Sequence, residues 1–529
     1  MNISGAEIVI RCIKEQGEKV IFGYPGGRAL ALYDALFSSG LEHVLMTNEQ
    51  HAVHAAVGYA RVTGRAGIVF ATSGPGATNL VTGIANAYMD SAPVVIVTCN
   101  VPRSKLGTDA FQEIDIAGVT MPITKYNAIA SSAEKLPQML RQAFQIAESG
   151  RQGPVLIDIP EDVLFEKGRY IKETRREPAR VIKWSGDDIA RAAALINESS
   201  RPTIYAGGGV VSSGAERELY LLSEKLDAPV GMSMMGLSSY PPSGRNWVGM
   251  IGSYGRKRAN AAIDDCDLLI AIGARFSERT APVPEEFAKN AKVLHIDVDA
   301  AEINKNRQTD MFLVGDAKEA LLALLPLTEE KSRRPVPLDA EGDVGGVRIS
   351  CRDELAYECF GEIDRAAGDS MIYTTDVGDH QLWATKYIEF SGRKRLITSG
   401  GLGAMGFGLG AAIGASIGGR GAKVINISGD GSFLMNAAEL ATISRLGLPV
   451  TDIVINNKAL GLVRRQQQLF FGGRESQSNT DWPVDYPALA RSFGLAGYRI
   501  EEPKDIGGVL AEIFASKKGA VVEIDAVEE

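Results

Sequence analysis

The sequence predicts an α/β fold of three Rossmann-like or flavodoxin-like domains, each built on a parallel sheet. The chain has 529 residues, which corresponds to about three domains at roughly 100 to 200 residues each. Short apolar runs typical of buried parallel strands alternate with stretches that have the period of a helix. Two polar stretches, at 166–183 and 329–346, separate three repeats of this pattern.

Each predicted domain contains three of these apolar runs. They lie at 66–72, 92–98 and 153–159 in the first domain (1–165), at 201–209, 266–273 and 291–299 in the second (185–328), and at 370–378, 422–431 and 451–457 in the third (347–529). In open parallel sheets, ligands bind beyond the carboxyl ends of the strands. We therefore expect the binding residues to follow these runs.

The composition excludes several classes of protein. Glycine accounts for 58 of the 529 residues, more than the average share of roughly 7%. Because the glycines have no triplet period and lie inside apolar segments, a collagen-like chain and a disordered chain are both excluded. The net charge of -9 and the lack of a basic stripe disfavour a nucleic-acid partner. The uncharged runs 66–89 and 396–419 contain prolines, asparagines or many glycines, so we expect no membrane span. No targeting signal is visible, which predicts a cytoplasmic protein.

The most informative segment runs from Gly429 to Asn457. An apolar strand leads into Gly429, Asp430, Gly431 and Ser432, a helical stretch follows, and a second apolar strand ends in two asparagines. Glycines allow backbone N–H groups to approach a diphosphate, and Asp430 and Asn457 offer the oxygen ligands that Mg²⁺ prefers. The three residues Gly429, Asp430 and Gly431 alone would also fit an ordinary turn. The whole spacing indicates a magnesium-diphosphate site.

Further motifs resemble the thiamine diphosphate (ThDP) enzymes, and within them the acetohydroxyacid synthase family, over essentially the whole chain. These motifs are FGYPGG (22–27), ATSGPGATNLVTGIANAYMDS (71–91), GTDAFQEIDI (107–116), PITK (122–125), SGGLGAMGFGLG (399–410) and GDGSFLMN (429–436). The resemblance implies that the first domain binds the aminopyrimidine of ThDP, the central one binds FAD, and the third binds diphosphate and Mg²⁺.

The resemblance also implies the residues that hold ThDP. Glu49 would hydrogen-bond the aminopyrimidine ring and so promote loss of the thiazolium C2 proton, although alone it could be a solvated glutamate. Met405 would support the bent cofactor, although alone it could be core filler. Ala459 would complete the metal shell through its carbonyl. The other implied contacts are Pro25, Val377, Gly378, Asp379, His380, Gly403, Leu460 and Gly461.

The implied reaction decarboxylates pyruvate and transfers the two-carbon unit to a second 2-ketoacid. Arg279 would bind the acceptor carboxylate, and Phe111, Gln112 and Lys125 would line the pocket; the two cations could instead be solvated surface charges. A related ligase with another acceptor is the alternative, and a non-catalytic paralogue is disfavoured because Glu49 and the metal ligands are present.

The central domain resembles the family's FAD-binding domain. FAD would be structural, because acetolactate formation transfers no net electrons, and a glycine-rich domain that binds nothing is the alternative. Asp297 would suit a ribose hydroxyl. The implied FAD contacts are Arg151, Gly207, Gly208, Gly209, Gly252, Gly273, Arg275, Asp297 and Asp316.

Four residues depart from the family pattern near the expected site. Arg28 follows YPGG and could bind a second acid group or reach solvent. His51, in a position where the family has glycine, could titrate near neutrality or pack at a helix start. Asp379 should weaken diphosphate binding by like-charge contact unless Mg²⁺ or another rotamer relieves it. Gln466 replaces a tryptophan that favours 2-ketobutyrate, so the acceptor stays open.

The resemblance further implies how the protein assembles. In the family, the glutamate-bearing domain of one subunit meets the diphosphate-binding domain of another. We therefore expect a homodimer or homotetramer with active sites between subunits, 2-ketoacids as small-molecule partners, and a possible small regulatory subunit.

Overall fold

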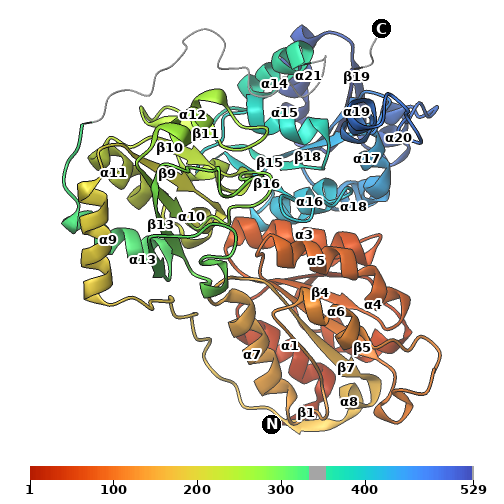
Figure 1. The fold of residues 1–529 in the computed structure, drawn as a ribbon. Coiled ribbons are helices and arrows are strands. Elements are labelled where there is room, and N and C mark those ends of the chain that lie inside the picture. The colour runs from red at the N-terminus through yellow and green to blue at the C-terminus, as the bar shows by residue number, and fades with distance from the viewer. Residues whose placement is uncertain (333–352, 393, 527–529) are drawn as a thin grey trace.

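Three six-stranded parallel sheets dominate the structure, a computed structural model that describes residues 1–332, 353–392 and 394–526 (Figure 1). The predicted fold class, α/β with three parallel-sheet domains, is confirmed. The predicted start of the third domain at 347 and most of the linker 329–346 lie outside the described residues. Within the described part, no helix combines the length and apolar character that crossing a membrane would need.

The first sheet has the strand order β3-β2-β4-β5-β7-β6. Side chains that alternate along β4 and β5 enter two different cores, because successive residues of a strand point to opposite faces. Its strands are β2 (Val20–Gly23), β3 (Glu42–Leu45), β4 (Gly67–Ala71), β5 (Val94–Asn100), β6 (Tyr126–Ile129) and β7 (Pro154–Pro160); β1 (Asn2–Ser4) and β8 (Lys167–Arg169) form a separate antiparallel pair. Its helices are α1 (Gly5–Glu15), α2 (Leu30–Phe37), α3 (Glu49–Thr63), α4 (Pro75–Asn79), α5 (Val81–Met89), α6 (Ile116–Thr120), α7 (Leu136–Glu148) and α8 (Glu161–Phe165).

The central sheet has the order β11-β10-β9-β12-β13-β14. Its strands are β9 (Pro202–Ala206), β10 (Val230–Met232), β11 (Trp247–Met250), β12 (Leu268–Ile272), β13 (Lys292–Asp297) and β14 (Met311–Val314). Its helices are α9 (Gly186–Glu198), α10 (Gly208–Ser213), α11 (Glu216–Leu226), α12 (Lys257–Asp265) and α13 (Ala317–Leu324). One face of this sheet shares a continuous hydrophobic core with the third domain.

The third sheet has the order β16-β15-β17-β18-β20-β19. Its strands are β15 (Ile372–Thr375), β16 (Arg395–Thr398), β17 (Val424–Gly429), β18 (Val450–Asn456), β19 (Ala496–Ile500) and β20 (Ala520–Asp525). Its helices are α14 (Asp353–Ala367), α15 (Asp379–Tyr387), α16 (Gly408–Gly418), α17 (Asp430–Asn436), α18 (Leu440–Leu446), α19 (Gly461–Phe470), α20 (Tyr486–Ser492) and α21 (Ile506–Ser516). All nine apolar runs recognised in the sequence form strands of the three sheets.

Helices α3 and α16 join the first and third domains (Figure 1). They approach so closely that a Cβ atom at Gly58 would collide with the carbonyl oxygen of Ala411, and one at Gly414 with that of Ala55. Around this crossing, apolar residues of both domains form one continuous core. The two domains of one chain therefore pack as a unit.

A methyl group at Gly414 should weaken this contact. We expect Gly414→Ala to lower the free energy of unfolding by about 1–3 kcal/mol, because overpacking forces the two helices apart. Gly508→Ala is the matched control, since Gly508 also lies in a helix but has open space around its Cβ position. Urea unfolding followed by circular dichroism measures both; equal midpoints for the two variants would contradict the close packing.

Candidate active site

The loops that follow β15, β17 and β18 meet at the carboxyl edge of the third sheet. A Cβ atom at Gly429 would lie 2.9 Å from His380 Nδ1, and one at Gly461 would collide with Asp379 Oδ2 and lie 3.0 Å from Asn457 Nδ2. The structure thus brings together Asp379, His380, Gly429, Asn457 and Gly461, which are far apart in the sequence. The glycines allow these side chains to approach the backbone more closely than a Cβ atom would permit.

A second set of glycines extends this edge. A Cβ atom at Gly431 would lie 2.9 Å from Leu460 Cδ2 and 3.9 Å from Met405 Cε, and one at Gly403, whose φ is +73°, would lie 3.9 Å from Val377 Cγ1. The backbone N–H of Gly429 donates to Ser432 Oγ at 3.0 Å. The implied ThDP contacts of the third domain therefore lie together at one edge of the sheet, in a glycine-rich group that we call the cradle.

Asp430 begins α17 and is almost completely buried. Burial raises its pKa to about 6, although a hydrogen bond from Thr480 Oγ1 acts in the opposite direction. Asn457 Oδ1 accepts a hydrogen bond from the backbone N–H of Ala459 at 3.2 Å. One carboxylate, one amide and one backbone carbonyl are donor types that suit Mg²⁺. Among the described residues no cluster of three or more His, Cys, Asp or Glu side chains could hold a metal.

Buried polar side chains in this region have atoms without a hydrogen-bond partner in the described part of the chain. They include Asp376, at Oδ2, His380, at Nε2, and Asn436, at both side-chain atoms. Burial lowers the pKa of His380 to about 3, so its ring is neutral at physiological pH. Unpaired buried polar atoms are costly, and a polar ligand in the cradle would satisfy them. Asn436 is the last residue of the GDGSFLMN motif but was not among the predicted site residues.

Glu49 begins α3 at the carboxyl edge of the first sheet and is 7% exposed. Its Oε2 accepts a hydrogen bond from Asn79 Nδ2 at 2.9 Å. A Cβ atom at Gly76 would lie 3.1 Å from Glu49 Oε1, and one at Gly26, beside Pro25, would collide with Thr72. Glu49 is therefore a buried, oriented carboxyl rather than a solvated one. Asn79, which orients it, was missed because its partner lies 30 residues away.

The loop at 107–113 carries Gln112 and Phe111. Glu113 organises it by accepting backbone hydrogen bonds from Thr108 at 3.2 Å and Ala110 at 3.1 Å. Gln112 has a φ of +61° and packs against Gly74, whereas the Phe111 side chain is 80% exposed. The loop thus offers an apolar side chain to its surroundings.

The two cations of the implied pocket lie apart from this loop. Lys125 Nζ donates to the carbonyl oxygens of Ile146 and Ser149, the latter at 2.7 Å, at the C-terminal end of α7. Burial lowers the pKa of Lys125 to about 8. Arg279 is exposed and its guanidinium lies 5.7 Å from the centre of the Tyr254 ring. The contacts of Lys125 are thus those of a helix cap.

The structure shows where two of the residues that differ from the family pattern, Arg28 and Gln466, are located. Arg28 forms an ion pair with Glu161 at 2.6 Å, so its guanidinium has a partner within the chain. Gln466 is exposed on α19, the helix that begins at Gly461. It therefore shares an element with the cradle.

The glycines of the central domain have a structural reason of their own. Gly207 N–H donates to Ile272 O at 2.9 Å and Gly209 N–H to Gly273 O at 3.1 Å. Side chains at these glycines would meet the facing backbone. Gly208 lies against Met235, and Gly252, with a φ of +111°, lies against Thr280. Close backbone approach explains this signature without a flavin.

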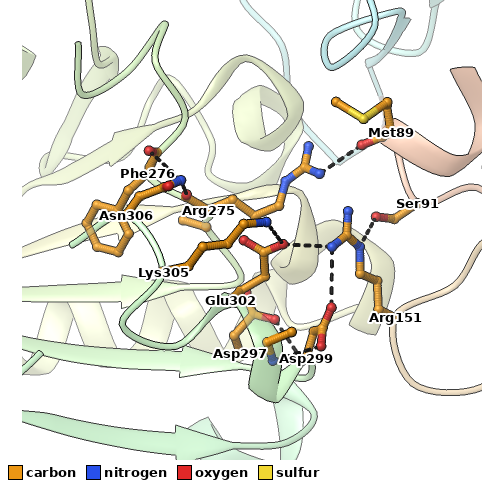
Figure 2. A network of polar contacts seen from close by, with 12 residues as sticks. Met89, Ser91, Arg151, Arg275, Phe276, Asp297, Asp299, Glu302, Lys305 and Asn306 are labelled. Carbon is orange, nitrogen blue, oxygen red and sulfur yellow. Dashed lines mark hydrogen bonds and ion pairs between the residues drawn. The ribbon is translucent and has the colours of Figure 1, made fainter. Parts of the chain in front are cut away.

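The charged residues implied in FAD binding contact protein groups (Figure 2). Arg151 pairs with Glu302 at 2.7 Å and Asp299 at 3.3 Å. Arg275 donates to Met89 O at 2.8 Å, which links the central domain to the first. Burial raises the pKa of Asp297 to about 6. Asp316 caps α13 through Lys318 N and Glu319 N and pairs with Arg180. FAD binding stays a prediction.

Comparison with known proteins gives the class of this chain. Residues 3–119 match the thiamine pyrophosphate enzyme N-terminal TPP binding domain, 189–324 the central domain and 376–524 the C-terminal TPP binding domain. The chain therefore belongs to the thiamine pyrophosphate enzyme family.

Its relatives narrow this class. It is 43% identical to a probable acetolactate synthase large subunit of Methanocaldococcus jannaschii, over 99% of this chain and 92% of that protein. It is 40% identical to the acetolactate synthase of Arthrospira platensis, over 99% and 94% of the two chains. It is 39% identical to the acetolactate synthase isozyme 3 large subunit of Escherichia coli, over 96% and 92%. Within the family, the chain lies among the acetolactate synthases.

Replacing Lys125 should distinguish a structural role at the C-terminal end of α7 from the predicted role in the substrate pocket. Because its ammonium bonds two carbonyls at the end of α7, we expect Lys125→Met to lower the free energy of unfolding by about 1–3 kcal/mol. The KM for pyruvate should change little. Thermal unfolding and steady-state kinetics measure the two effects, and a raised KM with unchanged stability would instead support a pocket role.

Proposed function

We propose that this chain is the catalytic subunit of an acetolactate synthase that uses ThDP and Mg²⁺. It decarboxylates pyruvate and transfers the two-carbon hydroxyethyl unit to a second 2-ketoacid, which gives 2-acetolactate or 2-aceto-2-hydroxybutyrate for branched-chain amino acid biosynthesis. The observation that carries this proposal is near full-length similarity to acetolactate synthases. These relatives do not favour the alternative of a specialised ligase with another acceptor.

The residues of the cradle fit the cofactor. Bound ThDP supplies an electron sink for the pair released when CO₂ leaves. Asp430, Asn457 and the carbonyl of Ala459 would hold Mg²⁺, and the glycine-lined loops would receive the diphosphate. Asn79 fixes the carboxyl of Glu49, which would hold a proton at a ring nitrogen of the aminopyrimidine. Met405, whose side chain lies near Gly431, would support the bent cofactor.

The assembly follows from the placement of these groups. Glu49 lies on the first sheet, whereas the cradle lies on the third. We propose that two copies of the chain meet so that Glu49 of one faces the cradle of the other, in a homodimer or homotetramer. Several relatives are named large subunits, which supports a small regulatory partner. Exposed apolar side chains near the cradle, Leu402, Met435 and Phe470, suit such burial.

A product assay tests the proposed function. Purified protein with pyruvate, ThDP and Mg²⁺ should release CO₂ and form acetolactate. Absence of both products would contradict the proposal. A panel of acceptor ketoacids then measures selectivity, where we expect a weak preference for 2-ketobutyrate because Gln466 offers no flat apolar wall. An absorbance scan reports any bound flavin.

Glu49→Gln should lower kcat by at least about a hundredfold, the usual scale of general acid–base catalysis. The affinity for Mg²⁺-ThDP should change little, because the cradle is on another sheet. Glu42→Gln, which changes an exposed carboxylate on β3, is the control and should keep full activity. Normal turnover by Glu49→Gln would show that the assignment of this residue is wrong.

The binding of Mg²⁺ and ThDP should depend on pH through Asp430. Its raised pKa of about 6 means that protons compete with the metal in weak acid. We expect affinity to be constant above pH 7 and to fall as the pH drops through about 6. Titration calorimetry measures this. Asp430→Asn should bind weakly at every pH, and an unchanged pH profile in that variant would contradict the metal role.

A further inference from the structure

We infer that Glu439 is a positioning residue that holds the segment presenting Glu49. This inference rests on the proposed function. Glu439 lies in the short turn Ala437–Glu439 that follows α17, and it is completely buried. It therefore connects the element that begins with Asp430 to the first domain of the same chain.

The contacts of Glu439 lie on both sides of Glu49. Its Oε1 accepts hydrogen bonds from the backbone N–H of Thr47 at 2.9 Å and from Thr47 Oγ1 at 2.7 Å. The same oxygen lies 3.0 Å from His51 Nδ1. Thr47 precedes Glu49 by two residues and His51 follows it by two. One carboxylate thus holds the backbone before Glu49 and the first helical turn after it.

The environment keeps this carboxylate ionised. Burial acts to raise the pKa of Glu439, but hydrogen bonds from His51, Thr47 and Thr442 outweigh it and leave the pKa below its usual range. Thr442 Oγ1 donates to Glu439 Oε2 at 2.7 Å. A charged acceptor forms stronger hydrogen bonds than a neutral one. For His51, the sequence left open whether its side chain titrates near neutrality or packs at the start of a helix. In the structure it is buried and contacts the carboxylate of Glu439.

Neighbouring contacts make the arrangement rigid. Arg445 of α18 donates to Leu45 O at 2.8 Å, just before the segment. His54 Nδ1 lies 3.2 Å from Gly406 O, and the α3–α16 crossing fixes the rest of the helix. Glu439 therefore holds the segment before α3 and the first turn of α3 by side-chain contacts, and α16 packs against the same turn, where Gly410 lies beside His51. Misplacement of a catalytic group by about 1 Å can cost a hundredfold in rate.

Two readouts test this role. The first is deuterium exchange of the Thr47 amide in protein without cofactor, followed by mass spectrometry. The second is exchange of the C2 proton of bound ThDP with deuterium, which reports the action of Glu49 without turnover. We expect Glu439→Ala to lose protection at Thr47 and to slow C2 exchange at least about tenfold, while the Kd for ThDP changes less than about threefold. Glu439→Gln, which keeps an acceptor oxygen, should restore most of both.

Glu148→Ala is the matched control. Glu148 is also buried, accepts a backbone hydrogen bond from Ala66 at 3.0 Å and pairs with Arg175, at the other end of the first domain. It should destabilise the protein without slowing C2 exchange. Equal slowing by Glu148→Ala and Glu439→Ala, or unchanged C2 exchange in the latter, would overturn the positioning role.

Three further outcomes distinguish failure of the inference from failure of the proposed function. If Glu439→Ala does not fold, Thr47→Val, which removes one donor to the same oxygen, should still slow C2 exchange about threefold, and no effect would overturn the inference. Wild-type protein that never exchanges the C2 proton would overturn the proposed function. Unchanged Thr47 protection in Glu439→Ala would overturn the contact itself, whatever the cofactor.

Discussion

The crossing of α3 and α16 is the contact on which the rest of the structure depends. Its helices meet backbone to backbone at Gly58 and Gly414, and one continuous core surrounds them. Because α3 carries Glu49 and α16 follows the glycine-rich segment with Met405, this contact fixes, within one chain, how Glu49 lies relative to the cradle; in the proposed assembly each of these groups faces the other group of a second copy. The central domain joins the same unit through its shared core with the third domain and through Arg151 and Arg275.

Several charged side chains of this unit contact polar groups of the same chain. Arg28, Arg151 and Lys125 contact carboxylates or carbonyls of the chain. At Asp430, burial raises the pKa by more than the hydrogen bonds lower it. At Glu439, the hydrogen bond and charge of His51, together with the hydrogen bonds of Thr47 and Thr442, outweigh burial and lower the pKa. At the edge of the third sheet, closely packed glycines lie beside buried polar atoms that have no hydrogen-bond partner in the described chain.

The sequence predicts the centre of each sheet better than its edges. Runs such as those of β4, β5 and β12 are continuous and apolar because both faces are buried. Edge strands such as β3 and β6 are short and partly exposed, so their patterns are weak. In the site, the motif residues could be named, but Asn79, Thr480 and Glu439 could not. Their roles arise from partners 30, 50 and 392 residues away.

The glycine crossing between Gly209 and Gly273 has a consequence for evolutionary history. Each of these glycines is needed because the facing backbone leaves no room for a side chain, whether or not a nucleotide is bound nearby. A lineage that abandoned the flavin would therefore keep them, since selection on folding alone would preserve them. The presence of such a motif therefore reflects the close approach of two chain segments at the ends of their strands. It does not by itself indicate that a flavin is bound.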